Sequence, residues 1–125
     1  MNYTEICGRI LDLSPSINDA FLIDMQSQLL AFKVKEEYAK YIDEGQFAER
    51  FEDLAFIIGA CKHYERTFDE LEYVDISYKT RKSVVFPIGT DRILVICLGK
   101  EEMDVQSLAV KVSEIIHERT QIIED

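Results

Sequence analysis

The strongest pattern in the chain is an apolar run over residues 93–98, which follows a predicted turn at residues 89–91. An apolar residue at every position is typical of a strand buried on both faces of a sheet. Residues 83–88 form a second predicted strand, in which Pro87 has no N–H to donate to a neighbouring strand. After the run, Asp104 is placed to cap a helix whose apolar residues recur at i, i+3, i+4 and i+7. This order predicts the second half of a small α+β sandwich.

The first part of the chain predicts a helix and a hairpin. Residues 2–13 have Asn2 as a potential cap and one apolar stripe at helical spacing, and the pair Ser14-Pro15 ends this helix. Apolar runs at residues 20–23 and 29–34 are separated by a polar stretch, which indicates two antiparallel strands.

The middle of the chain predicts a long, mainly helical segment followed by an alternating strand. The helical segment spans residues 36–68, and we expect Gly45 to divide it into a short entry piece and a main helix. From Tyr73 to Tyr78 apolar and polar residues alternate, so this strand is expected to be covered on one side only.

The main helix has more apolar surface than one sheet face can cover. One continuous stripe consists of Phe47, Phe51, Leu54, Ile58, Cys61 and Phe68. A second set flanks it and consists of Phe56, Ile57, Ala60 and Tyr64. Soluble proteins rarely leave such a patch uncovered. Either the N-terminal helix or a loop covers the second set, or a partner protein does.

Composition limits the class of protein. The 125 residues are enough for one domain over residues 1–125, and 47% of them are hydrophobic. Lys and Arg total 14 against 24 Asp and Glu, which gives a net charge of -10. This charge repels the phosphates of nucleic acids and anionic membranes. We therefore expect no nucleic-acid binding, and no apolar window is long enough to predict membrane insertion.

Cysteines and histidines give no indication of catalysis. The widely spaced Cys7, Cys61 and Cys97 lie in apolar contexts, which predicts buried free thiols and a cytoplasmic location. His63 and His117 are far apart, and Cys61 and His63 point in different directions on a helix, so no metal site is expected. No glycine-rich phosphate loop occurs. We expect no catalytic residue and no cofactor, and hence a protein that is not an enzyme.

Several segments together resemble the roadblock/dynein light-chain family, whose bacterial members include the MglB-type partners of small GTPases. The resemblance rests on residues 10–17 leading into residues 20–24, on Leu30-Ala31 at the end of the second strand, and on residues 93–98 before the last helix. The chain is also similar to a group of short archaeal roadblock-like proteins. One departure lies in the hairpin turn, where the family usually has Asp-x-x-Gly and this chain has Asp24-Met25-Gln26-Ser27.

The resemblance implies a five-stranded antiparallel sheet with helices on both faces, in the order α-β-β-α-β-β-β-α. It also implies a homodimer formed through the long helix and the neighbouring edge strand. The corresponding interface residues here are Phe56, Ile57, Ala60, Tyr64, Tyr73, Asp75 and Ser77. Such dimers act as platforms for Ras-like small GTPases or as adaptor subunits.

Three functions remain open. The first is a homodimeric interaction module that binds and regulates a Ras-like GTPase. The second is a small-molecule sensor, which predicts a monomer with an apolar cavity under the middle helix. The third is a structural adaptor subunit of a larger complex, which predicts a stable partner whose binding does not depend on nucleotide.

Overall fold

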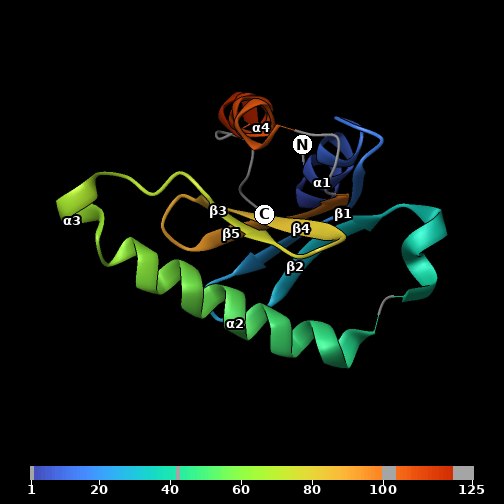
Figure 1. Ribbon diagram of the computed structural model, residues 1–125, viewed down its shortest axis with the longest axis horizontal. Coiled ribbons are helices and arrows are strands. Elements are labelled where there is room, and N and C mark those ends of the chain that lie inside the picture. The colour runs from blue at the N-terminus through green and yellow to red at the C-terminus, as the bar shows by residue number, and fades with distance from the viewer. Residues whose placement is uncertain (1, 42, 100–103, 120–125) are drawn as a thin grey trace.

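The computed structural model describes residues 2–41, 43–99 and 104–119. Figure 1 shows a sheet with helices on both sides. The elements in chain order are α1 (Tyr3–Leu11), β1 (Ile17–Asp24), β2 (Leu29–Val34), the 3-10 helix η1 (Glu36–Tyr41), α2 (Glu44–Lys62), α3 (Glu65–Phe68), β3 (Val74–Ser77), β4 (Arg81–Ile88), β5 (Arg92–Gly99) and α4 (Val105–Arg119). The predicted order of elements is confirmed, with η1 as the predicted short entry piece and α3 as a separate short helix at the end of the predicted helical segment.

The sheet is five-stranded and antiparallel, with the strand order β2-β1-β5-β4-β3. This confirms the predicted α+β fold class. The last strand in the sequence, β5, therefore lies at the centre, and all its residues from Ile93 to Leu98 are buried, as their apolar run predicts. At one edge, β3 is covered on one side only, because Asp75 and Ser77 are exposed while Val74 and Ile76 are partly buried.

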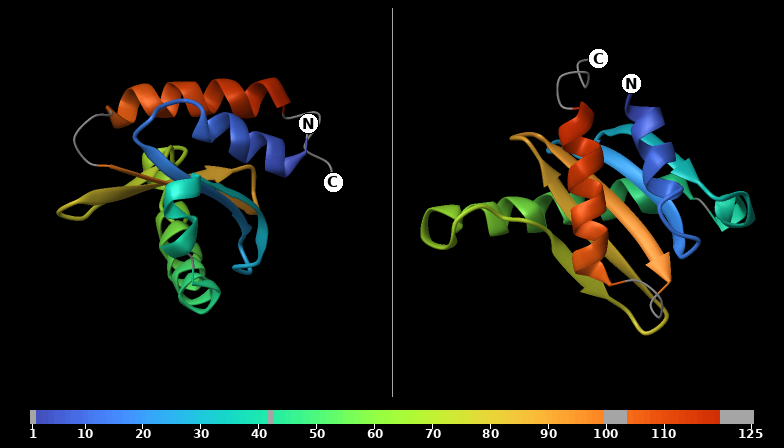
Figure 2. Two further views of the ribbon diagram at one scale, coloured as in Figure 1. Left: turned by 90° about the vertical axis from the view of Figure 1, so that its right-hand side faces the viewer. Right: turned by 90° about the horizontal axis from the view of Figure 1, so that it is seen from above.

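Helices cover the sheet on both faces, as Figures 1 and 2 show. The helices α1 and α4 lie side by side on one face, and α2 crosses the other. Each face has its own apolar cluster. The cluster under α1 and α4 includes Ile10, Leu108 and Val112, and the cluster under α2 includes Phe51, Leu54 and Ile58.

Caps fix the helix starts. The side chain of Asn2 accepts a hydrogen bond from the backbone N–H of Glu5, and Asp104 accepts one from the backbone N–H of Gln106. Both caps agree with the sequence-based prediction.

Two expectations for the long helical segment are wrong. The division lies at Asp43 rather than at Gly45, because the Asp43 carboxylate accepts hydrogen bonds from the first N–H groups of α2. Gly45 is therefore inside the first turn of α2. Phe68 was expected in the buried stripe, but its side chain is 77% exposed, because the helix breaks after α2 and α3 lies away from the core.

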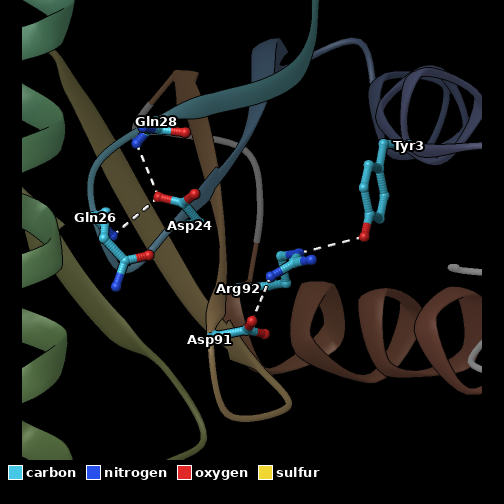
Figure 3. A network of polar contacts seen from close by, with 6 residues as sticks. All are labelled: Tyr3, Asp24, Gln26, Gln28, Asp91 and Arg92. Atoms are coloured by element: carbon cyan, nitrogen blue, oxygen red, sulfur yellow. Dashed lines mark hydrogen bonds and ion pairs between the residues drawn. The ribbon is translucent and has the colours of Figure 1, made fainter. Parts of the chain in front are cut away.

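The first hairpin closes without the family's usual glycine. Asp24 Oδ1 accepts hydrogen bonds from the backbone N–H groups of Gln26 and Gln28, both at 2.9 Å (Figure 3). Ser27 adopts the left-handed conformation with φ of 69°, which is the position that the glycine has in Asp-x-x-Gly. The two side-chain hydrogen bonds of Asp24 stabilise this turn despite the cost of placing serine there.

A second polar network ties this end of the sheet to α1 (Figure 3). Arg92 Nε donates to the Tyr3 hydroxyl at 3.2 Å, and Arg92 also forms a 2.6 Å ion pair with Asp91. The backbone N–H of Met25 donates to the carbonyl of Asp91 at 3.2 Å, so the β1–β2 and β4–β5 turns are joined. These contacts hold α1 over the start of the central strand.

Candidate functional site

The second half of α2 and the short helix α3 leave apolar side chains exposed. Phe56 is 76% exposed, Tyr64 is 56% exposed and Phe68 is 77% exposed. Ala60 is also exposed and lies one turn after Phe56 on α2, whereas Tyr64 and Phe68 follow the end of α2 and their rings lie 6.5 Å apart. We call Phe56, Ala60, Tyr64 and Phe68 the overhang surface.

The overhang surface extends beyond the sheet. Figures 1 and 2 show that the end of α2, together with α3, projects past the strands. The N-terminal helix does not cover this surface, because α1 lies on the opposite face of the sheet against β1, β2 and α4. The alternative in which α1 buries the second apolar set is therefore wrong. No described loop covers the set either, because Phe56, Ala60 and Tyr64 are exposed.

The β3 residues of the predicted interface point away from α2. Val74 and Ile76 pack in the cluster under α2, so their neighbours along the strand face the other side. The ring of Tyr73 accordingly lies 5.8 Å from the ring of Phe86, in the cluster under α1 and α4. Asp75 is exposed and pairs with Lys82 at 3.3 Å, and Ser77 is exposed on the same side.

The predicted interface residues therefore share one edge of the molecule rather than one face. The α2 residues Phe56 and Ile57 line a groove of about 420 Å³ against β3. The opposite wall of this groove includes Ile76 and Tyr78, and Tyr78 is 57% exposed. Sequence reasoning assigned Tyr78 to the edge but did not place it beside the helix.

A second candidate site was not predicted from the sequence. The sheet face under α2 is apolar in successive rows across the strands, but one row is polar. Asp19 of β1 pairs with Cys97 of β5, and Cys97 pairs with Ser83 of β4. Further along these strands the same face presents Phe21, Val95 and Val85, which are apolar and buried. We call Asp19, Cys97 and Ser83 the polar row.

Arg50 of α2 reaches down to the polar row. Its guanidinium donates to Ser83 Oγ at 2.7 Å and to Cys97 Sγ at 3.0 Å. Asp19 is only 7% exposed, and burial raises the pKa of its carboxyl group despite a side-chain hydrogen bond with Cys97 and the nearby charges of Arg50 and Arg81. Burial also raises the pKa of the Cys97 thiol, which keeps it protonated and unreactive.

A pocket of about 500 Å³ opens above the polar row. It lies between η1, the first turns of α2 and the ends of β1, β4 and β5. Its walls include Tyr38, Phe47, Arg50, Tyr78 and Arg81. Sequence reasoning missed it because the first strand was expected to start at Ala20, whereas β1 starts at Ile17 and includes Asp19. The sequence did indicate a polar position on this face, since Asp19, Phe21 and Ile23 are two residues apart and therefore lie on the same side of a strand.

Other chemistry is limited within the described residues. No group of three or more His, Cys, Asp or Glu residues there could hold a metal ion. The cysteines are unpaired, and burial raises the pKa of Cys7 to about 12. Cys7 and Cys97 are buried as predicted, whereas Cys61 is only partly buried, because it lies near the end of α2 where the sheet no longer covers the helix. Among the described helices, none has the length and hydropathy required to cross a bilayer.

Comparisons with known proteins separate sequence from fold. No family model and no curated protein matches the sequence. Solved structures do match the fold. A Roadblock/LC7 domain from Streptomyces avermitilis aligns with a TM-score of 0.76 at 10% identity, covering 97% of each chain. MglB from Myxococcus xanthus aligns with a TM-score of 0.75 at 14% identity, covering 98% of this chain and 90% of its own.

A third match is the gliding protein MglB from Thermus thermophilus, with a TM-score of 0.71 at 16% identity, covering 94% of this chain and 87% of its own. These alignments include nearly all of both chains, and they agree with the element order, the strand order and the placement of helices described above. The chain therefore has the fold of the roadblock family.

Proposed function

We propose that this protein is a non-enzymatic interaction module, a homodimeric platform that binds and regulates a Ras-like small GTPase in the cytoplasm. The observation that carries the proposal is the overhang surface, an apolar strip that projects beyond the sheet beside the free edge of β3. A strip of this kind in a strongly acidic protein is the usual mark of an interface.

A second copy of the chain fits this edge. Two β3 strands can pair antiparallel through their free backbone groups, which would extend the sheet across two subunits. The same two-fold arrangement would bring the projecting part of each α2 over its partner and bury Phe56, Ile57, Ala60 and Tyr64. Tyr73, Asp75 and Ser77 would then meet their counterparts on the other face of the joined sheet, so both predicted sets take part.

The GTPase as partner is supported by the fold alone. Two of the similar structures are MglB proteins, and the family resemblance implies a platform for Ras-like GTPases. A rigid platform can regulate a GTPase by binding one arrangement of its switch loops more tightly than another.

The first experiment tests the dimer by solution mass. Light scattering at tens of micromolar is expected to give twice the chain mass for the wild type and a monomer for Phe56→Glu and Tyr64→Glu. Val110→Glu is the matched control, because Val110 is 60% exposed on α4, on the opposite side of the sheet. A monomeric wild type, or a dimer that both overhang variants leave intact, would refute the proposed interface.

The second experiment tests the GTPase. The immobilised protein is incubated with lysate loaded with either a non-hydrolysable GTP analogue or GDP, and guanine nucleotide in the eluate is measured. Retention of nucleotide in one loading state only, reduced by Phe56→Glu and not by Val110→Glu, supports regulation. A partner retained equally in both states supports the adaptor function instead.

The alternative function, a small-molecule sensor, depends on a different feature of the structure. It was expected to require an apolar cavity under the middle helix. The pocket above the polar row lies at that place, but its floor is polar. A mainly apolar pocket of about 340 Å³ lies between α2 and the β1–β2 hairpin, and its lining includes Phe21, Leu29, Phe32, Phe47 and Phe51.

A further inference from the structure

The polar row contains a buried carboxylate with unused hydrogen-bonding capacity. Asp19 is more than nine-tenths buried, and its Oδ1 atom has no hydrogen-bond partner among the described residues. Leaving a buried polar atom without a hydrogen bond destabilises the folded chain, and more so when the group is charged. Asp19 nevertheless lines a pocket that opens toward solvent. Oδ1 itself is covered by the surrounding chain, so a ligand that donates a hydrogen bond from this pocket would pair with Oδ1 only after the carboxylate rotates toward it.

The remaining polar groups of the pocket favour an anion. Two guanidinium groups, Arg50 and Arg81, face a single carboxylate, so the pocket has one net positive charge when Asp19 is ionised. Arg50 is already fixed by Ser83 and Cys97, whereas Arg81 is exposed at the rim. This local charge is opposite to the net charge of -10 of the whole chain. An anionic ligand is therefore favoured here and disfavoured over most of the surface.

We propose that this pocket binds a small hydroxycarboxylate, with its neutral hydroxyl group donating to Asp19 and its carboxylate paired with Arg81 at the rim. A neutral donor fits better than an ammonium group, because the two arginines would repel a positive charge. A simple carboxylate would satisfy Arg81 but leave Oδ1 of Asp19 without a hydrogen bond. Both ends of the ligand are thus specified by residues of the pocket.

The walls specify the middle of the ligand. Tyr38, Phe47 and Tyr78 line the pocket between its polar floor and its rim. Aromatic walls with a few polar groups are typical of small-molecule sites, and about 500 Å³ lies within the usual size range. We therefore expect an aromatic hydroxy acid to bind more tightly than a small aliphatic one such as lactate.

The test uses phenyllactate and its analogue without the hydroxyl group, phenylpropanoate, as probes for isothermal titration calorimetry with the full chain. Phenyllactate is expected to bind at least about tenfold more tightly than phenylpropanoate. Arg81→Ala is expected to weaken phenyllactate binding by at least about tenfold, because the exposed arginine pairs with the carboxylate. Lys79→Ala is the matched control, since this exposed lysine of the neighbouring turn does not line the pocket.

Asp19→Asn tests the floor of the pocket. It is expected to reduce the difference in affinity between phenyllactate and phenylpropanoate, while circular dichroism shows that the variant remains folded. If Asp19→Asn does not fold, the probe pair and Arg81→Ala still decide the matter. The proposal is overturned if phenyllactate does not bind at millimolar concentration, if both probes bind equally, or if Lys79→Ala weakens binding as much as Arg81→Ala. Each of these outcomes is measured as probe binding rather than as solution mass or nucleotide retention, so a failure here is distinguishable from a failure of the dimer or of the GTPase proposal.

Discussion

The two faces of the sheet differ in how completely their helices cover them. The face under α1 and α4 is closed, and its cluster includes the fully buried Ile10 and Leu108. The face under α2 is interrupted by the polar row, and α2 continues past the sheet as an exposed apolar strip. Both faces thus bury an apolar cluster, but the face under α2 also has a polar row and a helix that leaves apolar side chains exposed.

This difference follows from how each helix meets the sheet. On α4 the apolar residues form one stripe, so the helix buries Leu108 and Val112 and turns its remaining surface to water. On α2 the apolar residues surround more of the helix, and only part of its length lies over the strands. The excess of apolar surface on α2 has no structural role in a single chain.

The largest effect is expected from the closed face. Leu108→Ala removes a side chain that is 0% exposed and should lower the free energy of unfolding by about 2–5 kcal/mol. Urea denaturation followed by circular dichroism measures this change. Val110→Ala on the same helix should change it by less than about 0.5 kcal/mol, because Val110 is exposed. Similar losses of unfolding free energy for the two variants would contradict the claim that the side of α4 carrying Leu108 is packed against the sheet and the side carrying Val110 is not.

The next effect concerns the overhang surface. If this surface forms a dimer, a tenfold increase in protein concentration should stabilise the wild type by about 1.4 kcal/mol, since folding and association are coupled. Phe56→Glu should unfold at the same temperature at every concentration, because its dimer is lost. Calorimetry over a range of protein concentrations measures both. If the unfolding temperature of the wild type does not depend on protein concentration, the overhang surface does not form a dimer.

The polar row predicts a pH-dependent effect of smaller size. The pKa of Asp19 is raised in the folded chain, so the folded state holds its proton more tightly than the unfolded state does. The resulting loss of folding stability is absent at pH values below the ordinary pKa of 3.8. It grows as the pH rises from 3.8 toward the raised pKa, and it is complete above the raised pKa.

Asp19→Asn should therefore be more stable than the wild type at neutral pH, on the order of 1 kcal/mol, with a gain that shrinks as pH falls toward 4. Urea titrations at several pH values measure this gain. Asp75→Asn is the comparison, since Asp75 is exposed and should show no such gain. A gain that grows as pH falls would reverse the assignment of the penalty to Asp19.

The smallest effect lies in the first hairpin, at the end of the sheet away from the polar row. Ser27→Gly relieves the left-handed conformation but increases the freedom of the unfolded chain, so a net gain of about 0.5 kcal/mol is expected. Gln26→Gly, at the neighbouring position, should not stabilise the chain. Urea denaturation of both variants measures the difference.

The sequence predicted the closed face better than the open one. The apolar run of β5 predicts a central strand, and the single apolar stripe of α4 predicts a helix with one buried face. The structure confirms both. The surplus of apolar positions on α2 was also visible in the sequence. Where these positions lie relative to the sheet edge depends on where the helix starts, and the helix starts after Asp43 rather than at Gly45. Asp19 could be recognised in the sequence as a polar residue in phase with Phe21 and Ile23, but its alignment with Cys97 and Ser83 could not, because it depends on the register of three strands.

The two edges of the sheet differ in a way that limits how many chains can join. The free edge of β2 carries the exposed Lys33, and Lys35 directly after it donates to the carbonyl of Pro15 at 2.6 Å. Charged lysines at an edge discourage the addition of another strand. The free edge of β3 is short and has no lysine within its four residues. If two chains pair through β3 as proposed, this difference between the edges would limit the assembly to a pair and prevent a fibre.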